Sequence, residues 1–180
     1  MTQLSPSDEV AHPPDFQSRP VRASDWPAIE ALHDVAFGPG ALTRAAYRAR
    51  EEQPRISPFC RTVYRAETIV AAIRYTPIRI GGTSGPLLLG PLAVAPAFAN
   101  QGHGRRLLAE SLEVARATGI ELVLLVGDPP YYARFGFVRA PAGRFIMPGP
   151  VDPSRILLLE MNGGIDLKGR FTGRVTGAAS

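Results

Sequence analysis

The 180-residue sequence is poor in cysteine, in lysine and in long apolar segments. Its single cysteine, Cys60, excludes an internal disulfide and is expected to be a small core residue rather than a nucleophile. No run of about 20 mostly apolar residues is present, so the sequence predicts no membrane-spanning helix. The first residues lack the basic and apolar segments of a secretory signal, and a cytoplasmic protein is therefore expected.

The basic residues are almost all arginine, since Lys168 is the only lysine among 20 Lys and Arg residues. Against 16 acidic residues this gives a net charge of +4, which predicts no more than a modest attraction for anions. The arginines are scattered, and no basic run with interleaved aromatic residues points to a nucleic-acid partner. No cluster of His, Cys and acidic residues has the spacing of metal ligands, so no bound metal is expected.

Composition and length indicate one globular domain, because 45% of the residues are hydrophobic and 20% are charged. Residues 1–17 are rich in polar residues and proline and are expected to form a flexible tail. The domain is expected over residues 18–163, and residues 164–180 are expected to form a loosely packed, glycine-containing extension.

Hydrophobic periodicity predicts an alternation of strands and helices along the chain. Strands are expected near Val21 and over Phe59–Arg65, Ile69–Ile80, Leu87–Val94, Leu122–Val126 and Ile156–Met161, with another entered at Gly136-Phe137. Helices are expected from Ser24 or Asp25 to Ala36, from Leu42 to about Glu52, along the apolar stripe from Leu107 to Ala115, and over Tyr131–Phe135.

One of these strands breaks the local rules for a strand. Leu87–Val94 is apolar on both faces, which predicts a central position in the sheet, yet its interior carries Gly90-Pro91. Proline cannot donate a hydrogen bond to a neighbouring strand, so a bulge or a splay is expected there. Such a departure in a buried strand suggests a functional reason.

A glycine pair marks the start of the helix that follows this strand. Gly102-His103-Gly104 precedes Arg105-Arg106, and two arginines in a first turn oppose the helix dipole unless an anion is bound. Unpaired N–H groups at a helix start bind phosphates, and glycine permits close approach. The segment is therefore interpreted as a pyrophosphate site, with an ordinary helix entry as the alternative; it matches neither a Rossmann nor a Walker motif.

The run from Leu87 to Ala140, which includes LGPLAV and GDPPYYARFGF, resembles the GNAT superfamily of N-acetyltransferases. Within that superfamily it resembles a subgroup of predicted bacterial acetyltransferases that share LGPLAV and GDPxYYxRFGF. The resemblance implies an α/β (α+β) fold with a mixed, mainly antiparallel sheet, splayed between its fourth and fifth strands and flanked by helices. It also implies that acetyl-CoA is the co-substrate and lies in that splay.

The resemblance further implies which residues hold acetyl-CoA. Backbone groups of the segment Leu92, Ala93 and Val94 would hold the acetyl carbonyl and the pantetheine amide. The pyrophosphate loop maps onto Ala99–Gly104, which assigns phosphate contacts to Gln101, Gly102, His103, Gly104, Arg105 and Arg106. The sequence departs from the family at Ala99, where Gln or Arg is usual, and at Asn100, where Gly is common. One side-chain contact is thereby lost, and Gln101, Arg105 or Arg106 could replace it.

For catalysis the resemblance points to Tyr132, four residues before Gly136, as the general acid that protonates the departing thiolate. The alternative is that Tyr132 belongs to an aromatic core cluster with its neighbours Tyr131, Phe135 and Phe137. The base that takes the amine proton is expected to be Asp128, Glu160 or a backbone carbonyl acting through water. His103 is not expected to be the base, because it lies beside the phosphates and away from the thioester.

The leading hypothesis is an N-acetyltransferase that moves the acetyl group of acetyl-CoA directly to a small-molecule or peptide amine, with no nucleic-acid or membrane partner. A non-catalytic acyl-CoA sensor with the same fold and a nucleic-acid-associated basic protein are the alternatives. Acceptor specificity is expected to depend on residues 35–50 and on the strand connections. The sequence leaves open the identity of the acceptor and whether the protein forms a homodimer.

Overall fold

The computed structural model of the chain describes residues 15–38 and 55–172. The helix predicted from Leu42 to Glu52 lies outside these residues. The helices are α1 (Trp26–Phe37), α3 (His103–Ala117) and α4 (Pro129–Ala133), with short 3₁₀ turns at Ala23–Asp25, Pro96–Phe98 and Pro153–Arg155. The strands are β1 (Phe16–Pro20), β2 (Arg61–Arg65), β3 (Thr68–Ile80), β4 (Thr83–Val94), β5 (Leu122–Val126), β6 (Val138–Arg139), β7 (Phe145–Ile146), β8 (Ile156–Glu160) and β9 (Gly169–Thr172).

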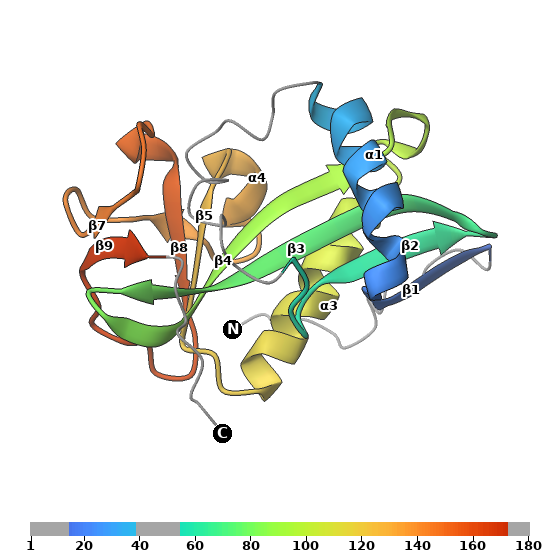
Figure 1. Cartoon of the computed structure of the whole chain (residues 1–180). Helices are drawn as coiled ribbons and strands as arrows, with labels where there is room; N and C mark the ends of the chain where they lie inside the picture. Colours follow the sequence, from blue (N-terminus) through green and yellow to red (C-terminus); the bar gives the residue numbers. More distant parts are fainter. Residues whose placement is uncertain (1–14, 39–54, 173–180) are drawn as a thin grey trace, which may run out of the picture.

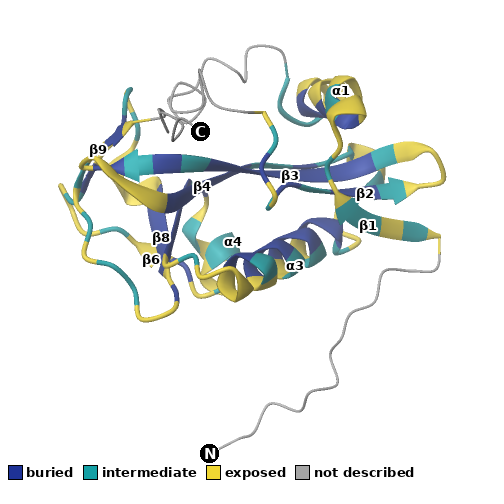
Figure 2. Cartoon of the chain, turned by 60° about the horizontal axis from the view of Figure 1, so that its bottom comes forward, coloured by how far each residue is buried: buried dark blue, intermediate teal, exposed yellow. Residues whose placement is uncertain are grey.

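The strands form a mixed sheet in the order β1-β2-β3-β4-β5-β8-β6, and β9 pairs with both β3 and β7. Along the main order every pair is antiparallel except β4–β5, which is parallel. Helix α1 covers one face of the sheet, whereas α3 and α4 cover the other (Figure 2). This arrangement confirms the predicted fold class, a mainly antiparallel sheet flanked by helices.

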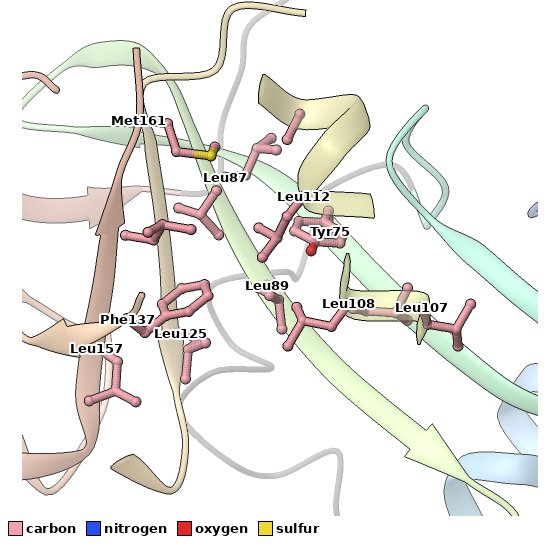
Figure 3. Close-up of a cluster of buried hydrophobic side chains, with 14 of the residues drawn as sticks. Tyr75, Leu87, Leu89, Leu107, Leu108, Leu112, Leu125, Phe137, Leu157 and Met161 are labelled. Carbon is pink, nitrogen blue, oxygen red and sulfur yellow. The ribbon is translucent and has the colours of Figure 1, made fainter. Parts of the chain in front are cut away.

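The central position predicted for β4 is confirmed, because both of its faces are packed. Leu87 and Leu89 point into a cluster with Leu107, Leu108 and Leu112 of α3 (Figure 3). Leu88 points to the opposite face, into a cluster with residues of β3, β5, β7, β8 and β9. A strand covered on both faces needs apolar side chains at consecutive positions, which is the pattern that the sequence carries.

The sheet opens at the middle of β4. The parallel pairing with β5 covers only Leu87 with Val123 and Leu88 with Leu124, although β4 continues to Val94. The register between β3 and β4 shifts beside Gly90-Pro91, whose peptide bond is cis. The splay that Gly90-Pro91 predicts is therefore present, on the β5 side of β4.

Both ends of the predicted domain differ from expectation. The segment from Asn162 onward is not wholly loose, because β9 pairs with β3 and Phe171 is 2% exposed in the core. At the other end β1 begins at Phe16, inside the predicted tail, and ends just before Val21. In both segments the apolar side chains are too widely spaced to show a period. Hydrophobic periodicity therefore did not predict β1 at Phe16 or β9.

Two further boundaries differ by a few residues. Helix α4 begins at Pro129 rather than Tyr131, since Asp128 takes the N-cap position and proline is well suited to a first helical turn. The strand after it, β6, is only Val138–Arg139.

Candidate functional site

Beyond Leu88, the opening between β4 and β5 leaves one edge of β4 without a partner among the described strands. Ala95 N–H donates to the carbonyl of Val70 at 2.8 Å, and hydrogen bonding alternates along an antiparallel pair. The N–H and C=O of Ala93 therefore point toward β3, whereas those of Leu92 and Val94 point toward the side from which β5 has diverged. The Ala93 side chain is buried against α1, so Ala93 shapes the strand while Leu92 and Val94 present their backbone groups to the opening.

The start of α3 lies against this open end of β4. A Cβ atom added at Gly104 would lie 3.4 Å from Val94 Cγ2 and 3.6 Å from Leu92 Cδ2. Gly102, the N-cap residue, has φ 86°, a left-handed conformation that glycine adopts without strain. The fold thus brings the unpaired N–H groups of a helix start next to the unpaired backbone groups of a strand, at one site that attracts anions.

The side chains of this loop and first turn differ in how they are held. The Gln101 amide donates to the carbonyl of Ala97 at 3.3 Å and so turns back onto its own loop. Arg105 is exposed. Arg106 is half-buried, and its Nε and Nη1 atoms are buried without a hydrogen-bond partner among the described residues. A guanidinium group in this state has capacity for an anionic ligand.

His103 does not offer its side chain to a ligand at the helix start. The imidazole is 1% exposed and packs against Phe16 of β1, with ring centroids 4.4 Å apart, and against Phe98 at 6.4 Å. The predicted contact of His103 with phosphate is thereby limited to its backbone N–H. The structure explains the residue as packing between α3 and β1, which periodicity could not show because β1 itself was not expected at Phe16.

Tyr132 lies on α4 at the end of β5. The carbonyl of Asp128 accepts its N–H at 3.3 Å, and its ring packs edge-to-face on Phe137 at 5.8 Å. A Cβ atom at Gly127 would lie 2.6 Å from Tyr132 Cε2, so glycine is required beside the ring. Burial, with contributions from Tyr131 and Asp128, raises the pKa of Tyr132 to about 12, and the phenol therefore stays protonated at neutral pH.

Tyr131, which the sequence analysis grouped with the aromatic core, also reaches the site. Its hydroxyl oxygen is 3.2 Å from the position of a Cβ atom at Gly104, between the start of α3 and the end of β4. Burial raises the pKa of Tyr131 as well, and Arg134 stacks over its ring at 5.6 Å. Neighbouring residues on a helix point about 100° apart. This geometry was the available signal that the two tyrosines have different surroundings.

Of the two candidate carboxylates, only Asp128 lies near Tyr132. Asp128 is exposed at the residue that joins β5 to α4, and its charge contributes to the raised pKa of Tyr132. Glu160 pairs with Leu122, at the opposite end of β5, and accepts a hydrogen bond from Arg144 at 3.0 Å. The expectation that Glu160 could act as the base is therefore wrong, because about four residues of strand, roughly 13 Å, separate it from the opening.

Cys60 is a core residue, as predicted. It is 2% exposed, and its sulfur lies within hydrogen-bond distance of Ser57 and of the Tyr75 N–H. Within residues 15–38 and 55–172, no group of three or more His, Cys, Asp and Glu side chains is placed to hold a metal ion. In the same part of the chain, no helix has the length and apolar character needed to cross a membrane.

Known proteins share both the sequence pattern and this fold. A family model described as an acetyltransferase (GNAT) domain matches residues 17–140. The uncharacterized N-acetyltransferase YhbS of Escherichia coli is 28% identical over 114 residues, which are 63% of this chain and 68% of YhbS. The uncharacterized N-acetyltransferase YjhQ of the same species is 39% identical over 120 residues, 63% of this chain and 65% of YjhQ.

Two solved structures have the same fold. Escherichia coli YhbS, crystallised in complex with CoA, has a TM-score of 0.73 at 23% identity over 91% of this chain and 93% of YhbS. A GNAT family acetyltransferase from Brucella melitensis, in complex with acetyl-CoA, has a TM-score of 0.68 at 23% identity over 89% of this chain and 96% of that protein. At these identities the likeness shows the fold.

Proposed function

The chain belongs to the GNAT acetyltransferase family, and from this premise we propose that it transfers the acetyl group of acetyl-CoA directly to an amine in a ternary complex. The acceptor is a small-molecule or peptide amine. The observation that carries the proposal is the opening between β4 and β5, which the start of α3 adjoins on one side and α4 on another. At that opening the start of α3 meets backbone groups of β4 and the Tyr131 hydroxyl, and α4 also carries Tyr132.

The residues at the opening fit acetyl-CoA in two separate parts. The N–H groups of Gly102, His103 and Gly104 and the guanidinium groups of Arg105 and Arg106 suit the pyrophosphate. The backbone groups of Leu92 and Val94 suit the pantetheine amide and the acetyl carbonyl. Acetyl-CoA supplies the activated thioester, and the protein positions it.

The reaction needs two proton movements, for which the site has candidates. As the amine nitrogen bonds to the thioester carbon, a backbone N–H of β4 stabilises the developing oxyanion. The C–S bond then breaks, and Tyr132 donates its proton to the departing thiolate. Asp128, or a backbone carbonyl acting through water, accepts the proton that the amine loses. Solvent returns a proton to Tyr132, so that the products are the acetylated amine and CoA.

A non-catalytic acyl-CoA-binding module is the second candidate. Ala99 stands where the family usually has Gln or Arg, and β4 carries no carboxylate near the opening. Both departures favour binding without turnover. The protonated Tyr132 beside Asp128 favours catalysis.

Acetyl-CoA titration followed by an acceptor screen tests the proposal. Because acetyl-CoA binds only the folded chain, about 100 times its Kd should raise the free energy of unfolding by about 2.7 kcal/mol. A screen of primary amines, monitored by release of CoA, should then give turnover. No thermal shift at millimolar acetyl-CoA would contradict the proposed function. A shift without turnover of any amine would favour the non-catalytic module.

A further inference from the structure

A pocket separate from the β4–β5 opening lies in the connection between β6 and β8. Its volume is about 210 Å³, and every residue that lines it is apolar or glycine. The larger lining side chains are Phe145, Met147, Val151 and Ile156. We call it the Met147 pocket.

The Met147 pocket lies on the face of the sheet opposite α3. On β5, Val123 and Leu125 join the cluster that contains the α3 leucines, whereas Leu122 and Leu124 join the cluster that contains Phe145, Met147 and Ile156. Successive side chains of a strand point to opposite faces, so these two clusters lie on the two sides of the sheet. The pocket therefore does not compete for space with a ligand held by the start of α3.

One wall of the pocket is tied to the end of β5. Ile156 pairs with Val126, the last residue of β5. Gly127 N–H donates to the carbonyl of Arg155 at 3.0 Å, and Arg155 Nε donates back to the carbonyl of Gly127 at 3.2 Å. These contacts fix the pocket wall to the corner from which Asp128 and Tyr132 follow.

We infer that the Met147 pocket receives an uncharged, apolar substituent of the acceptor amine. The inference rests on the proposed function: acetyl-CoA held by the start of α3 would occupy the α3 side, and the pocket lies on the opposite face, where an amine substituent would not compete with it. An amine between β4 and β5 is one to two strand spacings, roughly 5 to 10 Å, from Ile156. A side chain of the size of leucine or phenylalanine spans that distance.

Size and lining define the class of substituent. A cavity of about 150 Å³ lined by apolar side chains binds benzene, whereas whole ligands usually occupy about 300 to 1,000 Å³. The Met147 pocket thus suits one aliphatic or aromatic group of a larger acceptor. Among the described residues, no charged or polar side chain lines the pocket, so a charged substituent, such as the second ammonium of a polyamine, would find no ion-pair partner there.

Methionine methyl resonances test occupancy without requiring turnover. The full chain, labelled at its methionine methyl groups and saturated with CoA, is titrated with phenylalaninamide and separately with glycinamide. The aromatic ring of phenylalaninamide should shift the Met147 methyl resonance, while Met161, buried in the cluster on the α3 side, should not move. Glycinamide should move neither resonance. An unmoved Met147 methyl at phenylalaninamide concentrations that support acetylation would overturn the inference.

Acceptor selectivity provides the second test. Burying a phenylalanine-sized side chain should raise kcat/KM for phenylalaninamide about 10- to 100-fold above that for glycinamide. Val151→Phe, which fills the pocket, should bring this ratio close to one while leaving glycinamide turnover unchanged. Val138→Phe, the same change at an exposed residue of β6 outside the pocket, should preserve the ratio. Equal kcat/KM values in the unsubstituted protein, or a ratio that Val151→Phe leaves unchanged, would overturn the inference.

Failure of the proposed function gives a different result. In that case acetyl-CoA neither stabilises the protein nor is consumed with any amine. Failure of the pocket assignment alone leaves acetyl-CoA binding and glycinamide acetylation intact, with no preference for the larger amine.

Discussion

Arg19 and Arg106 differ in how their guanidinium groups are hydrogen-bonded. Arg19 of β1 is fully engaged: its guanidinium donates to both carboxylate oxygens of Asp25, at 2.8 and 2.9 Å, and to the Tyr64 hydroxyl. Arg106, in the first turn of α3, has buried Nε and Nη1 atoms with no hydrogen-bond partner among the described residues. At the first site the chain supplies its own anion, whereas at the second none of the described residues does.

The pKa of Asp25 shows how completely the first site is satisfied. Burial by itself would raise the pKa of this carboxyl, but hydrogen bonds from Arg19, Tyr64 and the Arg22 N–H outweigh burial and lower the pKa to about 2. The network joins β1 and β2 to the turn that starts α1, so its consequence is stability. Arg19 therefore supports the fold through a carboxylate of the chain itself, whereas for Arg106 the proposed phosphate ligand would be the anion.

The largest expected effect is on kcat and concerns the β4–β5 opening, beside Arg106. Tyr132→Phe removes the phenol donor and keeps the ring, so kcat should fall about 10²- to 10⁴-fold, with acetyl-CoA affinity and Tm nearly unchanged. Steady-state kinetics with an acetylated amine and thermal unfolding measure both. Tyr131→Phe, on the same helix, removes the other phenol of the site and tests which of the two donates the proton; kcat should fall much less than in Tyr132→Phe.

A parallel loss of Tm and activity in Tyr132→Phe would mean that the hydroxyl is structural. Tyr132 would then contribute to stability, as the residues around Asp25 do, and the contrast between the two sites would no longer hold. Full activity in both variants would instead show that the thiolate takes its proton from water.

The next largest effect is on the free energy of unfolding and concerns the pair of Arg19 and Asp25. Asp25→Asn should lower the free energy of unfolding at pH 7 by about 2 kcal/mol, which is what a lowering of the carboxyl pKa from 3.8 to about 2 represents. Because the folded-state pKa is lowered, this contribution is complete above about pH 4 and is lost as the pH falls toward 2. Urea unfolding of both proteins at pH 7 and near pH 3 checks the magnitude and the sign.

The control for Asp25→Asn is Glu30→Gln, which removes the carboxylate of an exposed pair 3.5 Å from Arg55. It should change the free energy of unfolding by less than about 1 kcal/mol. A difference between Asp25→Asn and the unsubstituted protein that persists undiminished below pH 3 would contradict the assignment, since the native carboxyl would then not be the source of the stability.

The smallest expected effect is on affinity. Arg106→Gln should weaken acetyl-CoA binding about tenfold, because one charge-assisted contact with phosphate is lost, and should leave stability unchanged or slightly higher because an unpaired buried cation is removed. Isothermal titration calorimetry gives the Kd. Arg116→Gln, at the other end of α3 and paired with Glu113, is the control and should not alter the Kd. Equal affinities for Arg106→Gln and Arg116→Gln would place the pyrophosphate elsewhere.

Much of the fold could be predicted because its signals are local. Gly90-Pro91 inside an apolar strand predicted the opening beside β4, and the glycines before Arg105 predicted the helix start. The positions of Glu160 and of the His103 side chain could not be predicted, because they depend on contacts between segments that are distant in the sequence. The antiparallel pairing of β5 with β8 places Glu160 beside Leu122, at the end of β5 away from the opening. The packing of the His103 imidazole between Phe16 and Phe98, which leaves only its backbone N–H for a phosphate, likewise depends on a strand far away in the sequence.

By itself the sequence determined the succession of strands and helices, the break in β4 and the residue types at the start of α3, because proline, glycine and apolar periodicity act on neighbouring backbone. Only the tertiary structure decided which of two adjacent tyrosines meets Gly104 and which meets Gly127. It also decided which arginine finds an internal carboxylate, and that an apolar pocket faces away from α3. These outcomes depend on the distance between groups far apart in the chain, a distance that strand order and register set and that no local pattern encodes.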